Sequence, residues 1–125
     1  MTFFENGRGA NMLVKEIVEQ LGLVIFSGEQ MLDKQVTGGV ISDILSDVMA
    51  QAQKGAIWVT NQTHENVLAI VFFKSLAGVI LPGGLQLDEP AAEKAIEKKL
   101  PVFLSQLSAF EIVGRLYELG IGKTL

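Results

Sequence analysis

The sequence contains no cysteine, and this absence excludes several kinds of chemistry. A chain without thiols forms no disulfide, builds no thiolate metal site and has no cysteine nucleophile. The start of the chain also lacks a basic segment followed by an apolar run, so the sequence predicts no signal peptide. Both features suit a reducing compartment, and we expect a cytoplasmic protein.

Positive charge is scarce. Ten Lys and Arg stand against 14 Asp and Glu, which gives a formal net charge of -4 at pH 7. Such a chain has no surplus positive field to hold a phosphate backbone, so nucleic acid is not an expected partner. The longest apolar stretch, residues 67–81, is interrupted by Lys74 and Ser75. It is shorter than the roughly 20 residues of a membrane-spanning helix, so we expect no membrane partner either.

Apolar residues, by contrast, are abundant. They make up 49% of the 125 residues, against 19% charged residues, and this balance argues against disorder. The length corresponds to one domain that can bury a core. Residues 1–11 show no periodic pattern. We therefore expect a flexible N-terminal segment over residues 1–11 and one domain over residues 12–125.

Short β-prone runs alternate with helical periodicity along the chain. The strand candidates are residues 23–26, 35–37, 56–60, 78–81 and 102–104. The helix candidates are residues 13–21, 40–53, 66–73, 89–99 and 109–119. Alternation of this kind is typical of a parallel sheet whose crossovers are helices. The sequence therefore predicts an α/β fold: a single domain with a mostly parallel sheet of four to five short strands and helices packed on it.

Side chains that cap helices precede several of these segments. Asn11, Thr63 and Asp88 each stand where a helix is expected to begin. Ser108 and Glu111 have the spacing of a capping box, in which each side chain bonds the backbone N–H of the other. These residues set the expected N-termini of four helices.

The loops that follow the predicted strands form the first candidate site. Ligands of open α/β sheets bind outside the carboxyl ends of the strands, where such loops converge. The hydroxyls, amide and backbone N–H groups there suit a polar ligand that is neutral or singly charged, such as a nucleoside or nucleotide. Ordinary caps and turns are the alternative interpretation. The candidate ligand-binding residues are Thr37, Gly38, Gly39, Ser42, Asp43, Thr60, Gln62, Thr63, His64, Gly83 and Gly84.

Other constellations point less clearly to chemistry. Asp33, Asp43 and Asp47 are oxygen ligands that Mg²⁺ accepts. The favoured interpretation is structural, with one aspartate stabilised by the helix dipole and one solvated. His64, the single histidine, is a candidate general base, but the sequence offers no evident nucleophile for it. The ending 122–124 imitates a phosphate loop, yet that motif requires glycine at position 117, which is tyrosine. We expect no cofactor and no metal.

The segment around Thr37-Gly38-Gly39 resembles the DRTGG domain, with Lys34 where the family's name places arginine. The likeness extends over residues 12–121 and is carried also by residues 42–49, 58–64 and 110–117. Related domains are fused to regulatory CBS domains, occur in phosphotransacetylases and form the amino-terminal part of HPr kinase/phosphorylase. The resemblance implies a regulatory or dimerisation unit. It offers no catalytic residues, and the phosphate loop of the kinase half is missing.

The expected function is therefore a non-enzymatic regulatory module that senses a ligand or binds a partner protein and acts as a homodimer. A mean hydropathy of +0.37 is high for a small monomer and favours an interface. Its expected anchors are Trp58, Phe72, Phe73 and Tyr117. The alternative is a small enzyme or phosphate-chemistry protein that uses Asp43 and His64.

Overall fold

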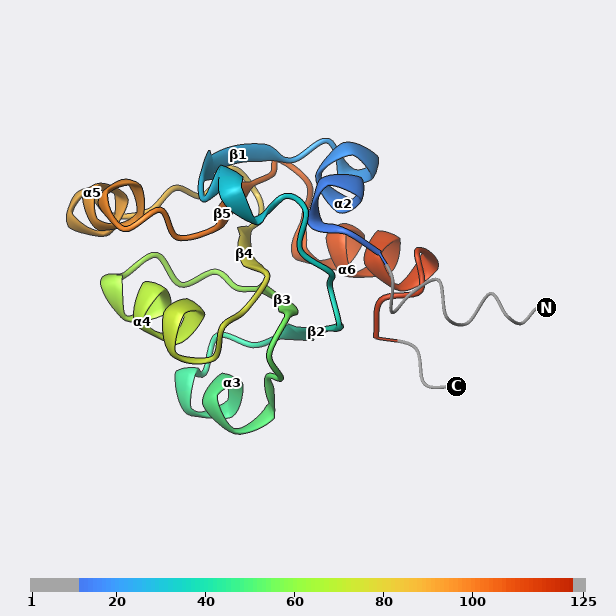
Figure 1. Ribbon diagram of the computed structural model, residues 1–125, viewed down its shortest axis with the longest axis horizontal. Coiled ribbons are helices and arrows are strands. Elements are labelled where there is room, and N and C mark those ends of the chain that lie inside the picture. Colours follow the sequence, from blue (N-terminus) through green and yellow to red (C-terminus); the bar gives the residue numbers. More distant parts are fainter. Residues whose placement is uncertain (1–11, 123–125) are drawn as a thin grey trace.

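A five-stranded sheet forms the centre of the protein, whose computed structural model describes residues 12–122 (Figure 1). The strands lie in the order β1-β5-β4-β3-β2; β2 to β5 are parallel, and β1 pairs antiparallel with β5. Their bounds are β1 Val24–Ser27, β2 Gly38–Ile41, β3 Ala56–Val59, β4 Gly78–Leu81 and β5 Val102–Leu104. The predicted α/β domain with a mostly parallel sheet is confirmed.

Helices cover both faces of this sheet. The crossover helices α3, α4 and α5 lie on one face, and α2 and α6 lie on the other (Figure 1). Their bounds are α2 Val14–Leu21, α3 Leu45–Gln51, α4 Glu65–Phe73, α5 Glu89–Glu97 and α6 Ala109–Glu118, with a 3-10 turn η1 at Glu29–Met31. None of the helices within residues 12–122 has the length and apolar character that a membrane crossing requires.

The central strands β3 and β4 are buried at every position because both of their faces carry helices. Successive side chains therefore enter two different cores. Trp58 packs in the core under α3, α4 and α5, whereas Ile57 and Val59 pack in the core under α2 and α6. This explains why the sequence shows unbroken apolar runs here rather than an alternating pattern.

The predicted boundary between the second strand and its helix was wrong. The sequence suggested a strand that ends at Thr37 and a helix that begins at Val40, with the glycine pair as the turn. In the structure Gly38 and Gly39 belong to β2, and α3 begins only at Leu45. Neither glycine has a positive φ. β2 is an edge strand, and an edge position tolerates glycine better than a central one, so the pair continues the sheet.

Two predicted caps also differ from the structure. Helix α4 begins after His64 rather than Thr63, whose hydroxyl donates to Asp88 instead. Helix α2 begins after Leu13, whose N–H donates to Oε1 of Glu16 at 2.8 Å. Asn11 lies outside the described residues, as does the expected flexible segment 1–11.

The predicted start of α6 is confirmed. The hydroxyl of Ser108 accepts from the backbone N–H of Glu111 at 3.2 Å. The other half of the expected capping box is absent, because the Glu111 carboxylate pairs with Arg115 one turn later at 2.6 Å. An N-cap and an i, i+4 ion pair therefore share the first turns of this helix.

Candidate functional site

The carboxyl ends of the parallel strands bring most of the predicted site residues to one edge of the sheet. The loops that follow β2, β3 and β4 all begin there. These loops carry Ser42, Asp43, Thr60, Gln62, Thr63, His64, Gly83 and Gly84. The expectation that loops after parallel strands converge holds for this group.

The carboxylate of Asp43 accepts several hydrogen bonds at this edge of the sheet. Its Oδ1 accepts from the Thr60 hydroxyl at 2.9 Å and from the Asn61 backbone N–H at 2.7 Å, and its Oδ2 accepts from Nδ2 of Asn61 at 3.0 Å. These bonds, that of the Asn61 backbone foremost, lower the pKa of Asp43 from its ordinary value, although partial burial acts in the opposite direction. The carboxylate therefore stays ionised and ties the loop after β2 to the loop after β3.

Backbone carbonyls of the same loop are also occupied. The indole Nε1 of the fully buried Trp58 donates to the Ser42 carbonyl at 2.9 Å. The side-chain amide of Gln62 donates to the Asp43 carbonyl at 2.9 Å. These contacts hold the segment between β2 and α3 in one position, so its polar groups serve the fold first.

His64 meets Asp88 at the next junction. Nδ1 of His64 lies 2.8 Å from Oδ2 of Asp88, and the Thr63 hydroxyl donates to Oδ1 of the same carboxylate at 2.9 Å. The hydroxyl is thus directed at the carboxylate and not at the imidazole. A nucleophile activated by histidine needs a hydroxyl bonded to the imidazole, and this arrangement does not supply one.

The glycine turn after β4 is likewise bonded within the protein. Gly83 and Gly84 have φ values of 65° and 79°, a left-handed conformation that favours glycine. Their N–H groups donate to the carbonyls of Leu107 at 2.8 Å and Ser105 at 2.9 Å. The backbone N–H groups of these two glycines, which were expected to bind a polar ligand, are therefore already used. The cavity that Ser42, Asp43 and Thr60 help to line is about 80 Å³, far below the 300–1,000 Å³ of typical ligand pockets.

The remaining predicted site residues lie elsewhere. Thr37 stands at the opposite, amino end of β2, where its hydroxyl donates to the Lys54 carbonyl at 2.6 Å. Gly38 and Gly39 lie within the strand, and Gly39 approaches Ile121 rather than the carboxyl edge. The expectation that Thr37-Gly38-Gly39 forms a loop at the carboxyl edge was wrong, because the strand begins where it was expected to end.

The three aspartates considered for Mg²⁺ do not converge either. Asp33 forms an ion pair with Lys15 at 3.2 Å, and Asp43 is bonded to Thr60 and Asn61. Across residues 12–122 no three His, Asp or Glu side chains are grouped so that they hold a metal ion. The first two carboxylates thus have partners within the protein.

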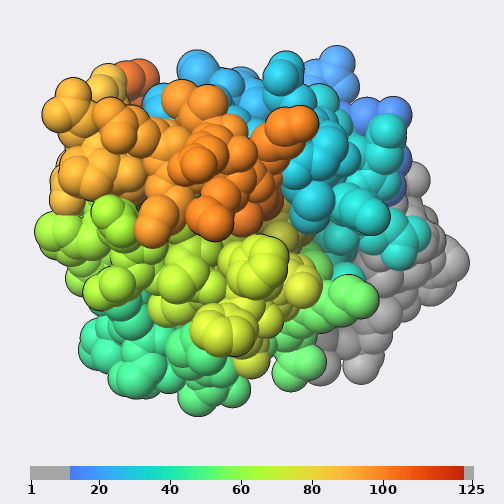
Figure 2. Space-filling view, turned by 60° about the vertical axis from the view of Figure 1, so that its left-hand side comes forward, coloured from blue at the N-terminus to red at the C-terminus, as the bar shows by residue number. Residues whose placement is uncertain are grey.

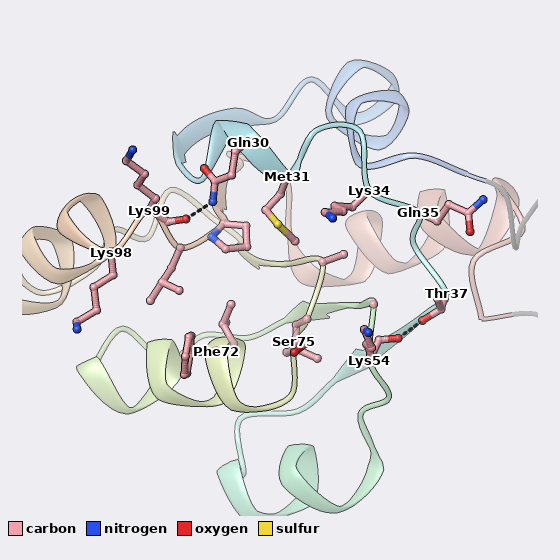
Figure 3. A pocket seen from close by; sticks show the side chains of 16 residues that line it. Gln30, Met31, Lys34, Gln35, Thr37, Lys54, Phe72, Ser75, Lys98 and Lys99 are labelled. Carbon is pink, nitrogen blue, oxygen red and sulfur yellow. Dashed lines mark hydrogen bonds between the residues drawn. The ribbon is translucent and has the colours of Figure 1, made fainter.

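A much larger cavity opens at the amino ends of the strands (Figure 3). Its volume is about 530 Å³, within the range of small-molecule pockets. On the surface, the ends of α4 and α5 and the segment around η1 meet at this face (Figure 2). The lining residues are Gln30, Met31, Lys34, Gln35, Thr37, Lys54, Gly55, Val71, Phe72, Ser75, Leu76, Ala77, Lys98, Lys99, Leu100 and Pro101.

The charges around this cavity have one sign. It is lined by Lys34, Lys54, Lys98 and Lys99, and no Asp or Glu contributes to it. In residues 12–122 these four are also the basic side chains without an acidic or carbonyl partner. The other basic side chains are paired: Lys15 with Asp33, Lys74 with the Met49 carbonyl, Lys94 with Glu65 and Arg115 with Glu111.

Sequence reasoning missed this cavity. The four lysines come from three separate segments, and Lys98 and Lys99 directly follow a helix that carries glutamates. The general rule for open sheets also directed attention to the carboxyl ends. One signal was present: Lys34 and Thr37 precede β2 and Lys54 precedes β3, and adjacent parallel strands bring their amino ends together.

Comparison with known proteins identifies the fold. No family model and no curated protein matches the sequence. The solved structure of the CBS and DRTGG domains of the regulatory region of Clostridium perfringens pyrophosphatase, in complex with its activator diadenosine tetraphosphate, is similar, with a TM-score of 0.66 and 15% identity. The match covers 92% of this chain and 50% of that one, so this chain spans half the length of its structural neighbour. The fold is that of a DRTGG-like domain.

Proposed function

We propose that this DRTGG-like domain is a non-enzymatic regulatory module that binds a small molecule in the amino-edge cavity and works as a homodimer in the cytoplasm. The observation that carries the proposal is the contrast between the two edges of the sheet. The carboxyl edge is bonded to itself, whereas the amino edge holds a cavity of about 530 Å³ with four unpartnered lysines. The regulatory region that shares this fold is bound to a nucleotide activator, which supports a sensing role.

The alternative, an enzyme that uses Asp43 and His64, has less support. Asp43 is held ionised by three hydrogen bonds and has no proton to donate as an acid. The imidazole of His64 is paired with Asp88. The Thr63 hydroxyl donates to the same carboxylate and not to the imidazole. Ligand binding by the carboxyl-edge residues stays a prediction, and His64 is the residue on which to test it.

Exposed aromatic side chains support the homodimer. On α6, Phe110 is 91% exposed and Tyr117 is 55% exposed. Seven residues separate them, so they lie near one another on the same side of the helix. At the end of α4, Phe73 is 76% exposed and lies outside the amino-edge cavity, whereas Phe72 lines that cavity. Trp58 cannot serve as the expected anchor because it is fully buried in the core.

A binding assay paired with a turnover assay tests the proposal. Calorimetric titration with a panel of nucleotides, nucleosides and sugar phosphates should find a ligand that binds the wild-type protein and raises its melting temperature, since a ligand that prefers the folded state stabilises it. The same panel should show no turnover, and His64→Ala should leave binding unchanged. Turnover of any member that His64→Ala abolishes would establish the enzymatic alternative instead.

A further inference from the structure

From the amino-edge cavity we infer the chemical class of its ligand: a nucleoside phosphate, with its phosphate between Lys34 and Lys54 and its base against Phe72. This inference deepens the proposed function and rests on it. The cavity has a charged end and an apolar wall, and a nucleoside phosphate offers both a compact anion and a flat ring.

The charged end is formed by Lys34 and Lys54. These lysines lie above and below one end of the cavity, whereas the amino groups of Lys98 and Lys99 extend away from it (Figure 3). A lysine ammonium is a point charge that binds phosphate well. Lys34 keeps its charge available even though Asp33 precedes it, because Asp33 is paired with Lys15 at 3.2 Å.

Helix ends are the competing explanation for lysines at this edge. The carboxyl ends of α3, α4 and α5 lie at the amino ends of the strands, and their carbonyl groups attract cations. Lys98, the C-cap of α5, the adjacent Lys99, and Lys54, which follows α3, fit that explanation. Other donors already serve helix-end carbonyls, with Lys74 on Met49 at 2.9 Å and Gln30 on Lys99 at 2.6 Å.

Lys34 lies outside any helix and stands apart from this explanation. It follows η1, a 3-10 turn of three residues that ends at Met31, and precedes β2, so no α-helix terminus lies in its segment. Thr37, three residues later, lines the same cavity and bonds the Lys54 carbonyl at 2.6 Å. The Thr37 bond therefore fixes the backbone of Lys54 beside the amino end of β2, so that two cations lie near one another, which is the chemistry that recognises a phosphate.

The apolar wall lies away from these two lysines. Phe72 lines the cavity with its ring largely exposed, and Met31, Leu76, Leu100 and Pro101 complete the wall. An exposed aromatic ring that faces a cavity is a stacking surface for a base, worth about tenfold in affinity. Phe73, the next residue, is exposed to a similar degree but does not line the cavity. It therefore provides a matched control.

Titration of the full chain with AMP, adenosine and ribose 5-phosphate tests both ends of the site. AMP should bind more tightly than adenosine or ribose 5-phosphate. Added salt should lower the affinity for AMP but not that for adenosine, since salt screens exposed charges. The double variant Lys34→Gln, Lys54→Gln should lower the affinity for AMP at least tenfold and leave the affinity for adenosine unchanged. The control pair Lys94→Gln and Arg115→Gln, which removes the same charge outside the cavity, should change AMP affinity less than threefold. All four are surface residues, and circular dichroism verifies the fold.

The outcomes separate the inference from the proposed function. Equal binding of AMP and adenosine, unaffected by Lys34→Gln with Lys54→Gln, would overturn the phosphate site and leave ligand sensing standing. The base site alone would be overturned if ribose 5-phosphate bound as tightly as AMP and if Phe72→Ala lowered the affinity for AMP no more than Phe73→Ala does. Failure of all three probes to bind would overturn the inference, whereas binding of another member of the wider panel would still uphold the proposed function.

Discussion

Thr37 and Asp43 stand at the two ends of β2, and each bonds that end of the strand to a neighbouring segment. The Thr37 hydroxyl donates to the Lys54 carbonyl at the amino edge, at 2.6 Å. The Asp43 carboxylate accepts from Thr60 and Asn61 at the carboxyl edge. The edge strand is thus held at both ends by side chains, in addition to its backbone ladder with β3. Among residues 12–122, the amino end opens into a cavity of about 530 Å³, and Asp43 lines one of about 80 Å³.

Asp43→Asn should destabilise the protein by about 1 kcal/mol at neutral pH. The change removes a charged acceptor from Thr60 and Asn61, and the exposure of the site lets water replace part of the loss. Urea unfolding of both proteins measures the difference. Asp33→Asn, which removes an exposed ion pair, should change the free energy of unfolding much less.

The same aspartate predicts a pH dependence. Because folding lowers the pKa of Asp43 below its ordinary value of 3.8, its contribution to stability is complete above that value and is lost as the pH falls through the folded-state pKa. The loss of stability between about pH 5 and the acid limit should therefore be shallower in Asp43→Asn than in the wild type. Unfolding curves collected over this pH range provide the measurement, and identical slopes would contradict the assignment.

Gly38 and Gly39 should respond in opposite ways to valine. A Cβ at Gly38 meets no atom within 4 Å, so Gly38→Val should be neutral or stabilise the strand by up to about 1 kcal/mol. A Cβ at Gly39 would lie 3.2 Å from Cγ2 of the buried Ile121, so Gly39→Val should cost about 1–3 kcal/mol. Chemical unfolding of the pair decides this. Equal effects would show that the register of β2 differs from the one described.

Trp58→Phe should destabilise the protein by about 2–3 kcal/mol. The substitution leaves a gap in the core and removes the donor to the Ser42 carbonyl. Ser42→Ala keeps that backbone carbonyl and should cost clearly less. Unfolding followed by circular dichroism suits both variants, because Trp58 is the single tryptophan and its fluorescence disappears with it. Equal losses in the two variants would argue against a structural role for the indole bond.

Light scattering should give about twice the chain mass of 13.5 kDa at micromolar concentration. If α6 forms the interface, Phe110→Ser should shift the protein toward the monomer, because a 91% exposed phenyl ring gains most from being covered. Phe73→Ser on α4 is the matched control. A monomer mass for the wild type would refute the dimer, and a response confined to Phe73→Ser would move the interface to α4.

The sequence predicted the well-buried parts of the fold better than its edges. The runs around Trp58 and Val79 are apolar on both faces, a pattern that leaves little choice but a central strand. The glycine pair was misassigned because glycine occurs both in turns and in edge strands, and only tertiary pairing distinguishes the two. Convergence of the loops at the carboxyl edge followed from parallel topology. That the Asp43 carboxylate has all its hydrogen-bond donors within the protein did not follow from topology, since this depends on atom positions in a neighbouring loop.

The cavity at the amino edge was beyond sequence reasoning for a related reason. Lys34 and Lys98 are far apart in the chain, and only the sheet order brings their segments to the same face. Hydrophobic periodicity indicates which side of one helix or strand is apolar. It does not indicate which helix and strand ends surround a cavity. No pattern in the sequence therefore groups Lys34 and Lys54 with Lys98 and Lys99.

The pairing of β1 with β5 determines when the sheet is completed during synthesis. β2, β3 and β4 each meet a neighbour that follows within one crossover helix, so they assemble from local segments. β1 instead pairs with β5, and the hydroxyl of Ser27 donates to the Leu100 carbonyl 73 residues later. A nascent chain that ends before residue 102 therefore carries β1 as an unpaired strand beside a partly formed parallel sheet. Among the strands within residues 12–122, the first to be synthesised is therefore the last to find its partner.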